Sequence, residues 1–312
     1  MKPHILKVAH VPHFLDAHLD QHFQVHVADQ DAKPGSLSSI APDVRALVAN
    51  GESTIRAALL DQLPALELIA VFGVGYDGVD VAAAQARGIA VTNTPDVLTD
   101  DVADMGMALL LALARRILEA DAFVRAQQWP TGPFGWSRSI SRQKVGIVGL
   151  GRIGSAFARR AAAFGMEITY TGRTAKPQAP YRYQPSLSVL AEEVDFLVVC
   201  AHGGDSTRGL INAQILQALG PHGLLINIGR GSVVDEPALI HALQNDIIAG
   251  AGLDVFAHEP NVPEALRALP NVVLTPHAAS ATTQTRQAMS DLVYENLAAH
   301  FTGRPLPTPV TR

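Results

Sequence analysis

A glycine-rich stretch near the middle of the chain restricts the possible folds more than any other feature. "KVGIV" (Lys144–Val148) has the apolar residues of a short buried strand, and "GLGRIG" (Gly149–Gly154) follows at once. The next segment, "SAFARRAAAF" (Ser155–Phe164), has the composition of a helix. A strand, a turn with glycines at these spacings and a helix together predict a dinucleotide-binding turn. A tight turn that binds no ligand is the alternative.

Each glycine of this turn has an expected purpose. Gly149 permits the tight turn, Gly151 lets the backbone approach a pyrophosphate, and Gly154 lets the helix pack close to the sheet. The N–H groups of Arg152 and Ile153 open the helix, so we expect them to point at the phosphates.

The next predicted strand, "EITYT" (Glu167–Thr171), ends in an unusual way. NAD-binding units usually carry an Asp or Glu there, which accepts hydrogen bonds from a ribose. This chain instead continues with Gly172, Arg173 and Thr174, and Lys176 follows closely. Gly172 leaves room for a 2′-phosphate, and the Arg173 guanidinium offers it several N–H donors. Because the usual carboxylate is absent, it does not repel that phosphate. We therefore predict a preference for NADP(H), with NADH possible; a solvated arginine is the alternative.

Short apolar runs alternate with helical segments on both sides of the turn, which predicts α/β domains with parallel sheets. The expected strands of the first series are Ile5–His10, Val44–Asn50, Leu66–Gly75 and Ile89–Pro95. Those of the second are Lys144–Val148, Glu167–Thr171, Asp195–Ala201, Gly223–Gly229, Ile248–Phe256 and Asn271–Pro276. One long, nearly apolar helix is expected from Thr99 through Leu118, a loop over Gln127–Gln143, and an amphipathic helix over Thr282–Phe301.

Bulk composition excludes several classes of protein. The chain has 312 residues, 48% of them apolar, which is enough for a large core and suits two domains. A formal net charge of −5 without a long basic run argues against a nucleic-acid partner. No apolar stretch is long enough to cross a bilayer, and the start lacks the long apolar segment of a signal peptide, so a cytoplasmic protein is expected.

Four charged groups follow strands of the second series. Arg230 lies in "NIGRG", Asp254 and Glu259 lie in "GLDVFAHEP", and His277 lies in "LTPHAAS". Ligands of open α/β sheets bind outside the carboxyl ends of the strands, so these groups are candidates for one site. Histidine exchanges protons near neutral pH, a neighbouring carboxylate favours the imidazolium, and arginine stabilises charge growing on an oxygen. The alternatives are a surface histidine, a phosphate-binding arginine and acids that cap helices or turns.

With "GLGRIG", "NIGRG", "LDVFAHEP" and "PHAAS" in this order, the chain resembles the D-isomer-specific 2-hydroxyacid dehydrogenases over essentially its whole length. Within that family, "YTGR" and "GVGYDGVD" look like the NADPH-dependent glyoxylate/hydroxypyruvate reductase branch. The resemblance implies two Rossmann/flavodoxin-like parallel-sheet domains with an active-site cleft between them. It also implies reduction of a small 2-oxo acid to the 2-hydroxy acid by hydride transfer.

The resemblance also carries roles onto matching residues. Arg230 would bind the substrate carboxylate and polarise the 2-oxo group, His277 would be the acid/base and Glu259 its partner. Asp254 would hold the nicotinamide carboxamide, and the backbone of Val74 and Gly75 would grip the substrate carboxylate.

Further expectations concern the rims of the site. Cys200, the only cysteine, reads as a buried strand thiol, and we expect it and Ile228 to lie at the cofactor. The loop "HGGDSTRG" (His202–Gly209) departs from the proline-leucine-threonine turn common in the family. His18 and His22 have metal-ligand spacing, but a solvated helix face is favoured and no metal site is predicted. Trp136 is a candidate to line a partner subunit's active site, with simple packing at a subunit interface as the alternative.

The predicted organisation is a substrate-binding domain at 1–98 plus 285–312 and a dinucleotide-binding Rossmann domain at 99–284. A homodimer is implied, with Thr99–Trp136 at the interface. Alternatives are a hydroxyphenylpyruvate reductase acting on aromatic 2-oxo acids, an NAD-linked D-2-hydroxyacid dehydrogenase, and a nucleotide-sensing corepressor built on the same fold.

Overall fold

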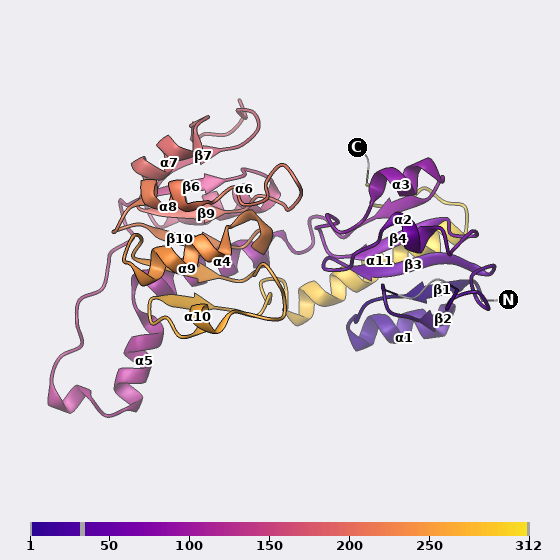
Figure 1. Ribbon diagram of the computed structural model, residues 1–312, viewed down its shortest axis with the longest axis horizontal. Helices are drawn as coiled ribbons and strands as arrows, with labels where there is room; N and C mark the ends of the chain where they lie inside the picture. The colour runs from indigo at the N-terminus through magenta and orange to yellow at the C-terminus, as the bar shows by residue number, and fades with distance from the viewer. Residues whose placement is uncertain (1, 32–34, 311–312) are drawn as a thin grey trace. The chain divides into compact units, whose positions relative to one another are not determined.

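The computed structural model describes residues 2–31 and 35–310, and they form two compact units (Figure 1). The first unit runs to Leu98 and resumes at Ala281, a few residues before the expected return at Thr285. The second unit is Thr99–Ser280. Each contains one parallel sheet, so the predicted fold class is confirmed.

The first unit has a five-stranded sheet in the order β2-β1-β3-β4-β5, in which every neighbouring pair is parallel. Its strands are β1 (His4–Lys7), β2 (Gln24–Val27), β3 (Val44–Asn50), β4 (Leu68–Phe72) and β5 (Ala90–Thr92). Its helices are α1 (His13–His22), α2 (Ala57–Leu60), α3 (Val81–Ala86) and α11 (Thr283–Phe301). Strand β2 was not predicted, because its residues "QVHV" are half polar, as suits the edge of a sheet.

Helix α1 packs against α11, and two of its histidines take part. The rings of His18 and His22 lie 5.5 and 4.9 Å from the ring of Tyr294, measured between centroids. His22 is exposed, as expected for a solvated helix face, whereas His18 is half-buried, and both rings also contact an aromatic side chain of α11.

The second unit has a seven-stranded parallel sheet in the order β12-β11-β10-β9-β6-β7-β8. Its strands are β6 (Lys144–Val148), β7 (Glu167–Thr171), β8 (Arg182–Tyr183), β9 (Phe196–Val199), β10 (Leu224–Asn227), β11 (Gly250–Leu253) and β12 (Val272–Leu274). Its helices are α4 (Thr99–Ala114), α5 (Ile117–Arg125), α6 (Arg152–Ala163), α7 (Leu187–Glu193), α8 (Ala213–Leu219), α9 (Glu236–Gln244) and α10 (Glu264–Arg267), with short 3₁₀ turns η1 (Trp129–Thr131) and η2 (Gly231–Val233). The strand order reverses between β6 and β9, where such sheets bind ligands.

The single helix expected from Thr99 through Leu118 is two helices. Helix α4 ends at Ala114 and α5 begins after Arg116. The φ of Arg116 is +52°, a left-handed conformation that interrupts the helical hydrogen-bond pattern. The apolar pattern continues across the break, so periodicity alone does not reveal it. Helix α4 lies on α6, β10 and β11, whereas α5 has no buried residue and extends from the second unit (Figure 1).

None of the helices in the described part of the chain combines the length and hydropathy that crossing a bilayer requires.

Candidate active site

The glycine turn joins β6 to α6 and is closely packed at two of its three glycines. Gly149 has a φ of +94°, and a Cβ there would lie 3.1 Å from the Cα of Ala201. A Cβ at Gly154 would lie 2.1 Å from the carbonyl oxygen of Gly149. A Cβ at Gly151, the N-cap of α6, would meet no atom within 4 Å, so space is open there.

This geometry fits a dinucleotide. The first N–H groups of a helix have no partner within the helix, and together with the helix dipole they attract an anion. In α6 these groups include those of Arg152 and Ile153, and they follow directly on the open space at Gly151.

The loop after β7 lies beside this turn, because the N–H of Gly149 donates to the carbonyl of Thr171 at 2.9 Å. Arg173, Thr174 and Lys176 are all exposed. Within the described residues, no carboxylate pairs with the Arg173 guanidinium. A cation available for an anionic ligand therefore stands where an acidic residue is usual.

Cys200 and Ile228 follow the next two strands of the sheet. Cys200 was expected as a buried strand thiol, but it lies one residue beyond the end of β9 and is half-buried as a residue. Its backbone N–H donates to the Val148 carbonyl at 2.9 Å, and desolvation raises the pKa of its thiol to about 12, so the thiol stays protonated. Ile228 is buried, and its side chain packs close to Gly106 of α4. The Ile228 N–H donates to the Val199 carbonyl at 3.2 Å, so the backbone group of Ile228 that remains for a ligand is its carbonyl.

Arg230 is held at the tip of β10 by a turn that Asn227 organises. The buried Asn227 amide accepts from the Gly229 N–H and donates to the Arg230 carbonyl, both at 3.0 Å. The Arg230 guanidinium donates to the Gly229 carbonyl at 2.9 Å. A Cβ at Gly231 would lie 1.9 Å from the Phe256 carbonyl, so only glycine lets this turn abut the loop that carries Glu259.

Glu259 and His277 are joined by a short hydrogen bond. His277 Nδ1 lies 2.6 Å from one carboxylate oxygen of Glu259, and the other oxygen accepts from the Phe256 N–H at 2.8 Å. Burial is the largest single influence on Glu259 and alone would raise the pKa of its carboxyl. The hydrogen bond and charge of His277, the Phe256 N–H and the charge of Arg230 outweigh burial, so this pKa lies below its ordinary value. Glu259 is therefore ionised at neutral pH.

Asp254 organises the loop on which His277 lies. Its buried carboxylate accepts from the Thr275 hydroxyl at 2.6 Å and from the N–H groups of Ala278 and Ala279 at 2.8 and 3.0 Å. Its carbonyl accepts from the His277 N–H at 2.8 Å, and His277 has a left-handed φ of +49°. Asp254 was expected to hold the nicotinamide carboxamide, with capping of the following turn as the alternative. Its hydrogen bonds to residues 275–279 were not predicted.

Val74 and Gly75 belong to the first unit, in the loop after β4. The side-chain amide of Asn93 donates to the Val74 carbonyl at 2.9 Å, and the Thr308 hydroxyl donates to the Asn93 carbonyl at 2.7 Å. Two neighbouring segments thus fix the backbone of this loop.

In the second unit, the structure brings the predicted residues to one edge of the sheet. Arg230, Asp254, Glu259 and His277 follow the adjacent strands β10, β11 and β12, and Arg173 follows β7. Five strand spacings separate β7 from β12, which is roughly 24 Å along the edge. A single ligand that contacts both ends must be long and extended, as a dinucleotide is.

Residues 107–279 match the family model described as "D-isomer specific 2-hydroxyacid dehydrogenase, NAD binding domain". The chain belongs to this family. It is an oxidoreductase. A dinucleotide turn together with a hydrogen-bonded Glu–His pair is what such an enzyme requires.

Relatives named as reductases are similar to this chain over most of their length. Hydroxyphenylpyruvate reductase of Plectranthus scutellarioides is 47% identical over 307 residues, 98% of each chain. Glyoxylate/hydroxypyruvate reductase A of Arabidopsis thaliana is 50% identical over 267 residues, 86% of this chain and 85% of the relative. The crystal structure of the NADPH-dependent glyoxylate/hydroxypyruvate reductase of Sinorhizobium meliloti with NADP and malonate is 47% identical, with a TM-score of 0.93 over 100% of this chain and 97% of that one.

Proposed function

We propose that this chain catalyses the NADPH-dependent reduction of a small 2-oxo acid, glyoxylate or hydroxypyruvate, to the 2-hydroxy acid. The observation that carries the proposal is the 2.6 Å Glu259–His277 pair, at the same sheet edge as a dinucleotide turn followed by Arg173. Two relatives named for glyoxylate and hydroxypyruvate, one of them NADPH-dependent, support it. Oxidation of NADPH by the purified protein on addition of either acid tests it.

The proposed chemistry assigns proton transfer to His277. A nicotinamide cofactor bound at the glycine turn would supply the hydride that the carbonyl carbon accepts, and the π electron pair of the C=O bond would then lie on oxygen. The imidazolium of His277 then gives that oxygen a proton. Because Nδ1 is engaged by Glu259, we assign the transferred proton to Nε2. Glu259 keeps the ring oriented and favours its charged form before the transfer.

Three further roles complete the proposal. Arg230 binds the substrate carboxylate and stabilises charge on the 2-oxo oxygen. One carboxylate oxygen of Asp254 accepts a single hydrogen bond from the described residues, so it has capacity for the nicotinamide carboxamide. The backbone of Val74 and Gly75 contributes to binding of the substrate carboxylate.

The cofactor preference has its own test, the variant Arg173→Ala. A hydrogen bond to a charged group contributes about 1.5–3 kcal/mol, so the Kd for NADPH should rise by roughly 10- to 100-fold. The Kd for NADH should hardly change, because NADH has no 2′-phosphate. An equal rise in the Kd of both cofactors, measured by titration calorimetry, would show that Arg173 does not bind the 2′-phosphate.

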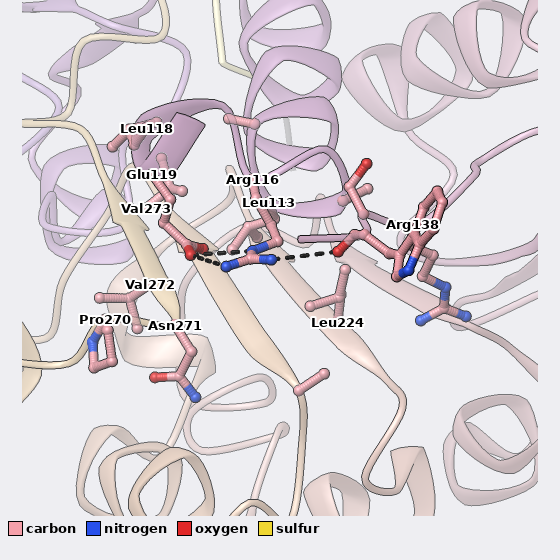
Figure 2. A pocket seen from close by; sticks show the side chains of 15 residues that line it. Leu113, Arg116, Leu118, Glu119, Arg138, Leu224, Pro270, Asn271, Val272 and Val273 are labelled. Atoms are coloured by element: carbon pink, nitrogen blue, oxygen red, sulfur yellow. Dashed lines mark hydrogen bonds and ion pairs between the residues drawn. The ribbon is translucent and has the colours of Figure 1, made fainter. Parts of the chain in front are cut away.

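We also propose a homodimer that uses the segment around α5, and a cytoplasmic location. The large apolar side chains exposed in this segment are Ile117, Leu118, Val124, Trp129 and Trp136. The Trp136 side chain is 98% exposed, more than a tryptophan in a monomer usually is. A cavity of about 430 Å³ lies beside it (Figure 2), where Arg116 bonds both Glu119 and the Trp136 carbonyl. Leu224 and Val272 line this cavity at the amino ends of β10 and β12, the opposite edge from the site.

A second candidate is the reduction of an aromatic 2-oxo acid. The relative from Plectranthus, named for hydroxyphenylpyruvate, is 47% identical over 98% of this chain and favours it. Turnover on phenylpyruvate separates the two candidates.

A further inference from the structure

Strand β8 has only two residues, and it places two tyrosines side by side. Tyr183 of β8 pairs with Tyr170 of β7 at the edge of the seven-stranded sheet. Their rings are tilted by 49°, and their centroids lie 5.3 Å apart. A strand this short adds little to the sheet itself, so its placement of Tyr183 is its most distinctive consequence.

Both tyrosine hydroxyls bond the backbone of the loop that follows β7. The Tyr170 hydroxyl accepts from the Lys176 N–H at 2.6 Å, and the Tyr183 hydroxyl donates to the Gly172 carbonyl at 3.0 Å. The two bonds therefore fix the two ends of the segment Gly172–Lys176. Tyr170 is 2% exposed, so the anchor at Lys176 is attached to the core of the unit.

Arg173 and Thr174 lie between these anchors and are exposed. No side-chain hydrogen bond to the rest of the described chain fixes either of them. An exposed loop that contains a glycine samples many backbone conformations unless it is tied down. The two tyrosine hydroxyls are thus the main restraint on where Arg173 and Thr174 can be presented.

We propose that Tyr170 and Tyr183 are positioning residues that set the discrimination between NADPH and NADH. They hold the Gly172–Lys176 backbone so that Arg173 and Thr174 are already placed to receive a 2′-phosphate. This proposal rests on the proposed preference for NADPH. Preorganisation of this kind strengthens binding because less conformational freedom is lost when the ligand binds. Only the phosphate-bearing cofactor gains from it.

The test compares Tyr183→Phe with the unmodified protein by titration calorimetry, using NADPH and NADH without substrate. Loss of one hydrogen bond should raise the Kd for NADPH by about 3- to 10-fold and leave the Kd for NADH unchanged. Tyr170→Phe should act in the same direction. Tyr181→Phe is the matched control, because its hydroxyl bonds nothing in the described chain, and both affinities should stay as they are.

A double variant separates positioning from a general structural effect. In the Arg173→Ala background, Tyr183→Phe should have a much smaller further effect on NADPH, because Thr174 is then the one remaining group of the two that it positions. Equal losses for NADPH and NADH, or a full additive loss in the double variant, would overturn the inference. If the unmodified protein bound both cofactors equally, the proposed cofactor preference would fail instead. A clear preference that Tyr183→Phe leaves intact would refute the tyrosine proposal alone.

Discussion

Replacement of His277 by alanine is expected to lower kcat for 2-oxo acid reduction by about 10²- to 10⁴-fold, the usual contribution of a positioned acid/base. In the proposed mechanism the imidazole gives the alkoxide its proton, and the methyl group of alanine has no proton to give. The Kd for NADPH should stay within about twofold, because the dinucleotide turn lies at β6, separated from β10 by β9 and further still from β12.

The matched variant is Glu259→Gln, which keeps the shape but removes the charge beside Nδ1. Its kcat should fall less than that of His277→Ala, and the pH profile of kcat should shift toward acid, because the imidazolium loses its anionic partner. If His277→Ala weakened cofactor binding but left kcat at saturating NADPH nearly unchanged, the assignment of His277 as proton donor would be wrong.

The second large effect is expected for Asp254→Ala. The substitution leaves the Thr275 hydroxyl and the N–H groups of Ala278 and Ala279 without their buried acceptor. Each unsatisfied group costs about 1–3 kcal/mol, so the free energy of unfolding should fall by at least about 3 kcal/mol. For a unit of this size, that lowers Tm by roughly 6–12 °C. The kcat should also fall, because the loop that places His277 loosens.

Asp254→Asn provides the comparison for this prediction. It retains one oxygen for Thr275 and Ala278 but sets an NH₂ group against the Ala279 N–H, so it should destabilise less than Asp254→Ala. Thermal unfolding followed by calorimetry measures both variants. An unchanged Tm in Asp254→Ala would mean that these three hydrogen bonds do not hold the His277 loop.

The sequence predicted the fold class because buried parallel strands are short apolar runs with strong local signals. The segments Val44–Asn50 and Glu167–Thr171 form strands with the predicted bounds, and α4 begins at Thr99. The edge strands β2 and β8 were missed, since half-polar or two-residue strands lack such a signal. The break at Arg116 was missed because a left-handed arginine leaves no mark in the hydrophobic pattern.

The charged site residues could be named from the sequence because each ends or follows an apolar strand and lies in a recognisable motif. The hydrogen bonds that hold these residues in place could not be predicted from the sequence. Asp254 bonds residues 21 to 25 positions away in the chain, and Tyr183 bonds Gly172 across an 11-residue excursion. Such contacts depend on strand order and register, which local patterns do not specify. The roles of the site residues toward cofactor and substrate, including those of Val74 and Gly75, stay predictions.

The most direct test of the central claim is steady-state reduction of glyoxylate, hydroxypyruvate and phenylpyruvate, each with NADPH and with NADH. We predict the highest kcat/KM for a small acid, glyoxylate or hydroxypyruvate, with NADPH, and a much lower value for the same acid with NADH. Equal rates with the two cofactors would contradict the proposal that Arg173 binds the 2′-phosphate of NADPH. The highest kcat/KM on phenylpyruvate would place this chain among the reductases of aromatic 2-oxo acids.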